Sequence, residues 1–111
     1  MRRDASEHSA KQSALELHEH VNRRVLETAR RVARSLAEAV GETDAERVRK
    51  EVERGMRERW FDPPLPPIRS WDFLGAVFRG DEWERVRFRP SEYPGSKNRY
   101  ISVWRLREKQ E

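Results

Sequence analysis

Apolar residues recur at helical spacing along the first half of the chain. Two series return every three or four residues, so each would line one face of an α-helix. The first series consists of Val21, Val25, Ala29, Val32, Leu36 and Val40. The second consists of Ala45, Val48, Val52, Met56 and Trp60. The pattern predicts two amphipathic helices, over residues 14–40 and residues 44–60.

A short polar segment separates these two predicted helices. Gly41 is well placed to end the first one, because glycine readily adopts the left-handed backbone conformation that follows a helix. Thr43 and Glu46 have the spacing of a capping box, in which the threonine caps the second helix and the glutamate reaches back to it. A link this short predicts an antiparallel helical hairpin within residues 5–60, with its first ordered turn between residues 5 and 14.

The two halves of the chain differ in composition. Every proline and every aromatic residue lies at or beyond Trp60. Residues 61–70 contain the run PPLPP, which is typical of the stiff polyproline II conformation. Pro64, Pro67 and Arg69 also match the ligand pattern of SH3 domains. We interpret the segment more simply, as a Pro-rich connector that holds a helical part against a β-sheet part.

The last third of the chain has the composition of β-strands, because it is rich in β-branched and aromatic side chains. The three expected strands are residues 71–79, 82–89 and 100–107. Gly80 and Asp81, between the first two strands, suit a two-residue hairpin turn with glycine first. We therefore predict a three-stranded antiparallel β-meander over residues 71–108, and an α+β fold for a single domain of residues 1–111.

Arginine occupies alternate positions in part of the predicted sheet, where successive side chains point to opposite faces. In the expected register Phe73, Val77 and Phe88 face the helices, and an arginine-rich face turns away from them. Such a face with exposed rings is typical of proteins that bind single-stranded nucleic acid, although an ordinary solvated sheet face gives the same pattern. The candidate nucleic-acid-binding residues are Phe78, Trp83, Arg85, Arg87, Arg89, Arg105 and Arg107.

The overall charge of the chain supports a basic binding surface only weakly. The chain has 24 Lys and Arg residues against 20 Asp and Glu, which gives a formal net charge of +4. All but four of the basic residues are Arg, which binds carboxylate and phosphate groups in a planar, bidentate manner. A GC-rich genome or adaptation to heat would also enrich Arg and Glu. The bias therefore identifies no ligand by itself.

The sequence offers no recognisable catalytic, metal or cofactor site. It contains no cysteine, which excludes disulfides, thiolate chemistry and cysteine-bound zinc, and which fits a cytoplasmic protein. His18 and His20 would point about 200° apart on a helix, so they could not share a metal ion. The sequence contains no glycine-rich phosphate loop, signal peptide or apolar run of about 20 residues. We expect a protein that is not an enzyme, uses no cofactor and contacts no membrane.

Three functions are consistent with this sequence. The leading interpretation is a small binding protein that contacts nucleic acid through the arginine-rich sheet face. The second is a protein–protein interaction module, such as an inhibitor, an adaptor or an antitoxin-like factor, that uses the long helix and the exposed aromatic residues. The third is a structural subunit, since a thin core and an overlong first helix favour a homo-oligomer. Arginines that pair with carboxylates on their own surface would weaken the first interpretation.

Overall fold

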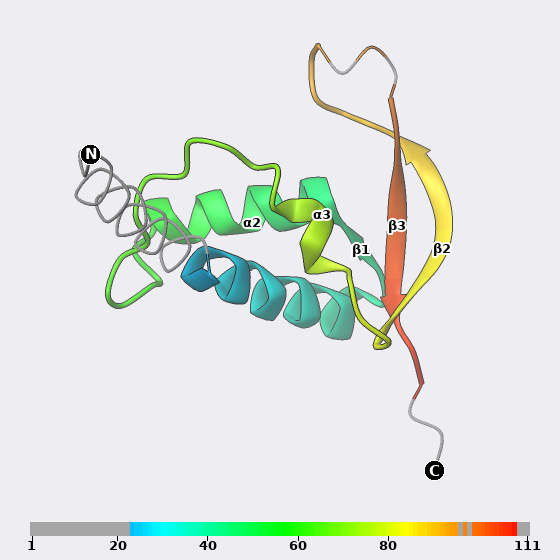
Figure 1. Ribbon diagram of the computed structural model, residues 1–111, viewed down its shortest axis with the longest axis horizontal. Coiled ribbons are helices and arrows are strands. Elements are labelled where there is room, and N and C mark those ends of the chain that lie inside the picture. The colour runs from blue at the N-terminus through cyan, green and yellow to red at the C-terminus, as the bar shows by residue number, and fades with distance from the viewer. Residues whose placement is uncertain (1–22, 96, 98, 109–111) are drawn as a thin grey trace, which may run out of the picture.

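The computed structural model describes residues 23–95, 97 and 99–108. The expected helix start near residue 14 and the histidines lie outside these residues. Within them the chain is helical over residues 23–40, and further helices and strands follow. These are β1 (Thr43–Asp44), α2 (Ala45–Arg57), α3 (Leu74–Val77), β2 (Trp83–Pro90) and β3 (Tyr100–Leu106). Helices combine with a three-stranded antiparallel sheet, which confirms the α+β class (Figure 1).

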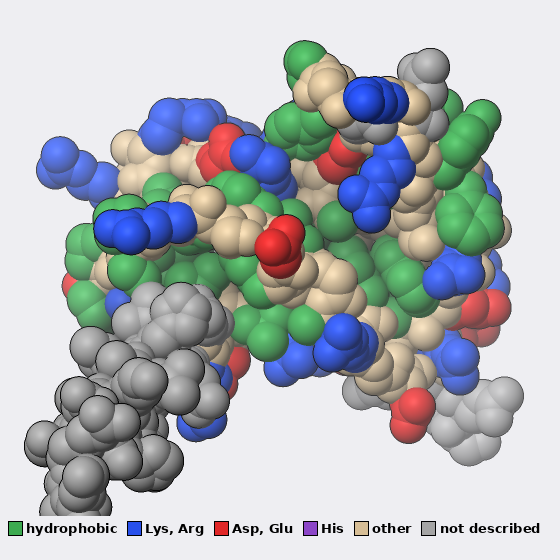
Figure 2. Space-filling view, turned by 45° about the horizontal axis from the view of Figure 1, so that its top comes forward, with side chains coloured by type: hydrophobic (Ala, Val, Ile, Leu, Met, Phe, Trp, Pro, Cys, Tyr) green, Lys and Arg blue, Asp and Glu red, His purple; other side chains and the backbone are tan. Residues whose placement is uncertain are grey.

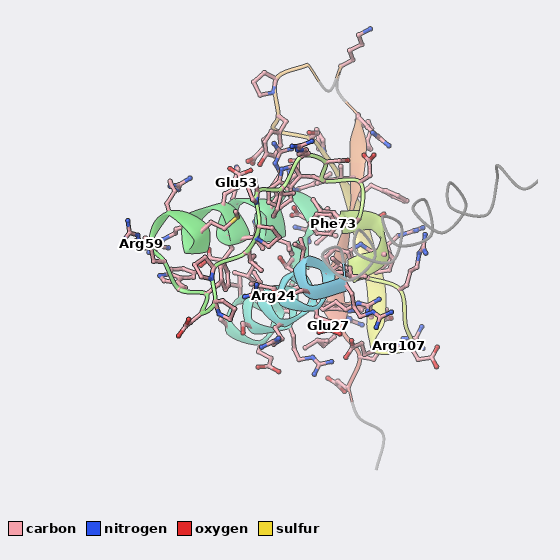
Figure 3. The ribbon with its side chains drawn as sticks, turned by 60° about the vertical axis from the view of Figure 1, so that its left-hand side comes forward. Arg24, Glu27, Glu53, Arg59, Phe73 and Arg107 are labelled. Atoms are coloured by element: carbon pink, nitrogen blue, oxygen red, sulfur yellow. The ribbon has the colours of Figure 1, made fainter. Side chains whose placement is uncertain are left out.

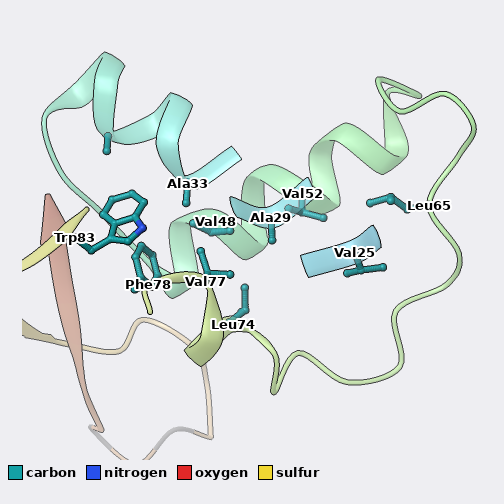
Figure 4. Close-up of a cluster of buried hydrophobic side chains, with 11 residues drawn as sticks. Val25, Ala29, Ala33, Val48, Val52, Leu65, Leu74, Val77, Phe78 and Trp83 are labelled. Carbon is teal, nitrogen blue, oxygen red and sulfur yellow. The ribbon is translucent and has the colours of Figure 1, made fainter. Parts of the chain in front are cut away.

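The core lies between the helices and one end of the sheet. The N-terminal helix (residues 23–40) and α2 run in opposite directions, and α2 contacts both α3 and the sheet (Figure 1). Buried apolar side chains from these helices, the connector and β2 form one cluster (Figure 4). Its members are Val25, Ala29, Ala33, Ala37, Val48, Val52, Leu65, Leu74, Val77, Phe78 and Trp83.

The buried face of the N-terminal helix is rotated from the one that the apolar pattern predicts. Its buried apolar residues are Val25, Ala29, Ala33 and Ala37. Val32 and Leu36 pack only at the edge of the core, and Val40 is 62% exposed. The alanines leave room for the bulkier Val48 and Val52 of α2. Packing therefore selects the alanine row, whereas the pattern alone favours the larger side chains.

The link between these two helices confirms one predicted signal and corrects another. Gly41 adopts a φ of 99°, and its N–H donates to the carbonyl of Ala37 at 2.7 Å, as expected for the residue after a helix. The predicted capping box is wrong, because Asp44 caps α2 by accepting from the N–H of Arg47 at 3.0 Å. Thr43 instead pairs with β3 as part of β1, and this pairing moves the helix start one residue along the chain.

The predicted strand over residues 71–79 is wrong. That segment contains α3, whose turn begins with the N–H of Leu74 donating to the carbonyl of Trp71 at 3.0 Å. Leu74, Val77 and Phe78 are buried, and their spacing of three and four residues puts them on one side of a helical turn, whereas a strand would point Leu74 and Val77 to opposite faces. The expected hairpin turn after residue 79 is therefore absent. The third strand is β1, so the sheet has the order β1-β3-β2 and is not a meander.

A β-bulge in β2 decides which side chains share a sheet face. Arg85 pairs with Trp104 and Arg87 pairs with Val103, so Val86 is an extra residue in β2. Paired residues of neighbouring strands point to the same face. One face, here called the aromatic face, carries Trp83, Arg85, Phe88, Tyr100, Ser102, Trp104 and Leu106. The opposite face, here called the ion-paired face, carries Glu84, Arg87, Arg89, Ile101, Val103 and Arg105.

Candidate nucleic-acid interface

Three arginines of the predicted set lie on the ion-paired face, and each one pairs with a carboxylate. The pairs are Arg87–Glu42, Arg89–Asp44 and Arg105–Glu84. The hydrogen bond from Arg87 lowers the pKa of Glu42 below its ordinary value of 4.5. Equivalent hydrogen bonds to carboxylates raise the pKa of Arg87 and of Arg105. The Arg87–Glu42 pair is therefore intact at neutral pH, and it is lost only as the pH falls through the lowered pKa of Glu42.

The pair between Arg89 and Asp44 is the most buried of the three. Nε and Nη2 of Arg89 donate to the two carboxylate oxygens of Asp44 at 3.0 and 2.9 Å. Only 1% of the Asp44 side chain and 16% of the Arg89 side chain are exposed. The hydrogen bond to Asp44 raises the pKa of Arg89. This bidentate pair joins β2 to the cap of α2, which is a structural role.

A second set of contacts fixes the β2–β3 loop on the first turns of α2. Glu46 accepts from the hydroxyl of Ser91 and, at 3.0 Å, from the backbone N–H of Glu92. Nζ of Lys50 donates to Glu92 at 3.1 Å, and this hydrogen bond lowers the pKa of Glu92. The guanidinium of Arg49 lies 4.8 Å from the ring centroid of Tyr93, whose pKa is raised by burial. The residues that follow β2 are therefore held by the body of the molecule.

The two predicted stacking residues, Trp83 and Phe78, lie in the core. Their exposed fractions are 3% and 6%, so the prediction that they project from the arginine face is wrong. The Phe78 ring stacks on that of Trp104 with a centroid distance of 5.4 Å and meets Trp83 edge-on at 4.9 Å. Phe78 is buried because it follows α3 directly and packs into the core. Trp83 is buried because the end of the aromatic face where β2 begins packs on the same core.

The other two predicted arginines lie apart from the ion-paired set. Arg85 is on the aromatic face, because the bulge at Val86 interrupts the alternation that would have aligned it with Arg87. Arg107 follows the end of β3, where its side chain is exposed and its backbone N–H donates to the carbonyl of Glu82 at 2.8 Å (Figure 3). The structure thus divides the predicted arginines among three places.

The part of the aromatic face next to the β2–β3 loop exposes two rings that were not predicted there. Phe88 is 58% exposed and Tyr100 is 66% exposed. Phe88 pairs with Ser102, two residues from Tyr100, so the two rings are diagonal neighbours on adjacent strands. The guanidinium of Arg85 lies 5.1 Å from the Phe88 ring centroid and 5.2 Å from that of Trp104. The sequence pattern had assigned Phe88 to the core, but Phe88 lies beyond the part of this face that packs on the core, where Trp83 is buried.

This aromatic face differs from the ion-paired face in its charge. The strand positions that form it include Arg85 but no Asp or Glu, because the acidic residue of β2, Glu84, points the other way. Among the described residues, no ion pair involves Arg85. Hydrophobic side chains gather at the right-hand edge of the space-filling view, over the β2–β3 hairpin, with basic side chains beside them (Figure 2). The face therefore combines exposed rings with an uncompensated positive charge.

Comparison with known proteins provides no functional assignment. No known protein family, curated protein or solved structure matches the chain. In the part of the chain that the structure describes, no helix combines the length and apolar character of a membrane span. Those same residues contain no group of three acidic, histidine or cysteine side chains arranged to hold a metal ion.

Proposed function

We propose that this protein is a non-enzymatic binding protein that contacts nucleic acid through the aromatic face of its β2–β3 hairpin. One observation carries the proposal: Phe88 and Tyr100 are exposed as diagonal neighbours, beside Arg85, on a sheet face with no acidic strand residue. Exposed rings can stack on bases, and an arginine beside them can contact phosphate. The ligand class is the one expected from the sequence, but most of the residues are different.

The arginines of the ion-paired face support this proposal less well than Arg85 does. A phosphate that approached Arg87 or Arg105 would compete with Glu42 or Glu84, which already accept hydrogen bonds from these guanidinium groups. Arg89 is largely buried. Pairing of this kind weakens the original form of the nucleic-acid interpretation. We therefore move the proposed contact to the aromatic face, where the positive charge is free of such competition.

Self-association and protein binding through the same hairpin are less well supported. Two copies that met at their aromatic faces would bring Arg85 against its equivalent, with no acidic strand residue to compensate. The outer edge of β2 could in principle accept a strand from a partner, but it carries a bulge at Val86 and ends at Pro90, and both features hinder edge pairing. A homo-oligomer formed through an antiparallel helical hairpin, and a cytoplasmic location, stay predictions.

Binding of oligonucleotides to the wild type and to a ring-deleted variant tests the proposed function. We expect the wild type to bind mixed RNA and DNA oligonucleotides at low salt and to bind them more weakly as salt rises, because phosphate contacts release counterions. Replacing both Phe88 and Tyr100 with alanine should weaken binding by at least tenfold, since each stacked base contributes about 1–3 kcal/mol. The stability of this variant should stay close to that of the wild type, because both rings are exposed.

Fluorescence anisotropy with labelled oligonucleotides measures the affinity, and urea denaturation measures the stability. Phe88→Tyr with Tyr100→Phe is the matched control, because it exchanges the two ring types and keeps both stacking surfaces. A wild type with no affinity for any oligonucleotide at low salt would show that the proposed function is wrong.

A further inference from the structure

We propose that the aromatic face binds a single strand of nucleic acid, with successive bases stacked on Tyr100 and Phe88 and with little preference for sequence. This inference rests on the proposed function and specifies its ligand. It comes from the order of groups along the hairpin, the spacing of the two rings and the polar groups that the face lacks.

Cations stand at both ends of the exposed rings. Lys97 and Arg99 precede Tyr100 in the loop and are exposed, and Arg85 follows Phe88 at the other end of the exposed surface. The ion pairs formed among the described residues involve none of these three cations. Along the hairpin, exposed cations of the loop therefore precede the two rings, and Arg85 follows them. A strand laid along it would place phosphates near both ends and bases over the middle.

The spacing of the rings favours an unpaired strand over a duplex. Diagonal neighbours on adjacent antiparallel strands lie about 7–8 Å apart, so Phe88 and Tyr100 present two separate stacking surfaces. Bases in a duplex are already stacked on one another about 3.4 Å apart along each strand, and neither ring could reach a base face there. A single strand can splay its bases and offer both faces to protein rings.

The aromatic face has few groups that could read a base edge. Its strand positions carry the half-buried Ser102 and the hydroxyl of Tyr100, but no Asn, Gln, Asp or Glu. Base-specific contacts usually depend on such side chains or on a bidentate arginine. The Arg85 guanidinium lies over the Phe88 and Trp104 rings, where it can contact a phosphate beside a stacked base. We therefore infer a site that tolerates many sequences.

The first residues of the β2–β3 loop are positioned before any ligand arrives. Ser91 and Glu92 are held by Glu46, and the N–H of Ser91 also donates to the carbonyl of Arg99 at 2.7 Å. Tyr93 packs under the guanidinium of Arg49. Groups that are already ordered lose less conformational entropy on binding, so this arrangement favours affinity.

Four labelled 12-mers of equal length separate this inference from the proposed function. They are an oligo-dT strand, a mixed-sequence strand, a duplex and a single strand that lacks bases, each titrated with the full-length chain at the same low salt concentration. We expect the two base-containing single strands to bind within about threefold of each other. Both should bind at least tenfold more tightly than the duplex and the abasic strand, because only they supply free base faces. Tyr100→Ala should weaken the oligo-dT complex about 5- to 150-fold, the loss expected for one stacked base.

Each contrary result has a distinct meaning. If the duplex binds as tightly as oligo-dT, the inferred preference for a single strand is wrong, although the proposed function survives. If the abasic strand binds as tightly, the rings do not stack on bases, and the proposed use of the aromatic face is wrong as well. If the affinities of the two single strands differ by a hundredfold, the site distinguishes base sequences, and the inferred tolerance of many sequences is wrong. Tyr100→Phe keeps the ring and should bind like the wild type. If none of the oligonucleotides binds, both the inference and the proposed function are overturned.

Discussion

Replacing Trp83 with alanine should destabilise the fold by about 3–5 kcal/mol, the usual cost of removing a large buried ring. Trp83 is 3% exposed and packs edge-on against Phe78, and Trp104 stacks on the same Phe78 ring. The truncation would leave a cavity at the junction of the sheet and α3, where the surrounding side chains cannot collapse fully. Urea denaturation followed by circular dichroism measures the effect as a lower midpoint with an unchanged slope.

Phe88 provides the matched control for this substitution, because it is an aromatic residue of the same strand and the same sheet face. It is 58% exposed, so Phe88→Ala should change the free energy of unfolding by less than about 1 kcal/mol. The two variants should then have opposite phenotypes, one unstable and the other weak in oligonucleotide binding. A Trp83→Ala protein that unfolds at the wild-type urea concentration would show that Trp83 is not part of the core.

Asp44→Ala is expected to cost about 3 kcal/mol of stability, although Asp44 is a polar residue. Its carboxylate caps α2 through the N–H of Arg47 and forms the bidentate pair with Arg89. Removing it leaves an uncapped helix and a largely buried guanidinium that keeps the carbonyl of Pro90 at 2.9 Å and Glu46 at 3.2 Å. Most of the expected cost comes from the loss of the bidentate partner of this largely buried guanidinium. Thermal and urea unfolding both report it.

Glu42→Ala is the control, because it also removes an ion pair with an arginine of β2, but that pair is much less buried. Glu42 pairs with Arg87 as Asp44 does with Arg89, but Arg87 is half exposed and Glu42 caps no helix. Solvent screens an exposed pair, so this substitution should leave the unfolding midpoint close to that of the wild type. Equal losses for the two variants would mean that burial of Asp44 contributes nothing, contrary to the geometry described above.

Local patterns predicted those features of the fold that depend on local interactions. The helical periods of residues 25–37 and 45–56 and the helix end at Gly41 could be recognised in the sequence, because helices form from contacts between near neighbours. The segment around Leu74, Val77 and Phe78 could not be assigned in this way. Its apolar residues suit both a short strand and one helical turn, and packing against α2 decided between them.

The candidate site was harder to predict because it depends on pairing between distant segments. A single extra residue, Val86, moves Arg85 to a different face from Arg87, and no local signal marks that bulge. Two of the three carboxylates that neutralise the ion-paired face come from residues 42 and 44, more than 40 positions away in sequence from their arginines. Sequence reasoning found a three-stranded antiparallel sheet with arginines on it, but it did not find which of them are paired.

Comparing Arg85→Ala with Arg87→Ala by salt-dependent titration of a 12-mer single strand is the most direct test of the proposed interface. Both substitutions remove an arginine from the same strand, one on each side of the bulge. Arg85→Ala should weaken binding and reduce the slope of log affinity against log salt by about 0.7, the loss of one phosphate contact. Arg87→Ala should leave both quantities unchanged, because Glu42 already occupies its guanidinium. The reverse result, with Arg87 required and Arg85 dispensable, would place binding on the ion-paired face and contradict the interface proposed for Phe88 and Tyr100.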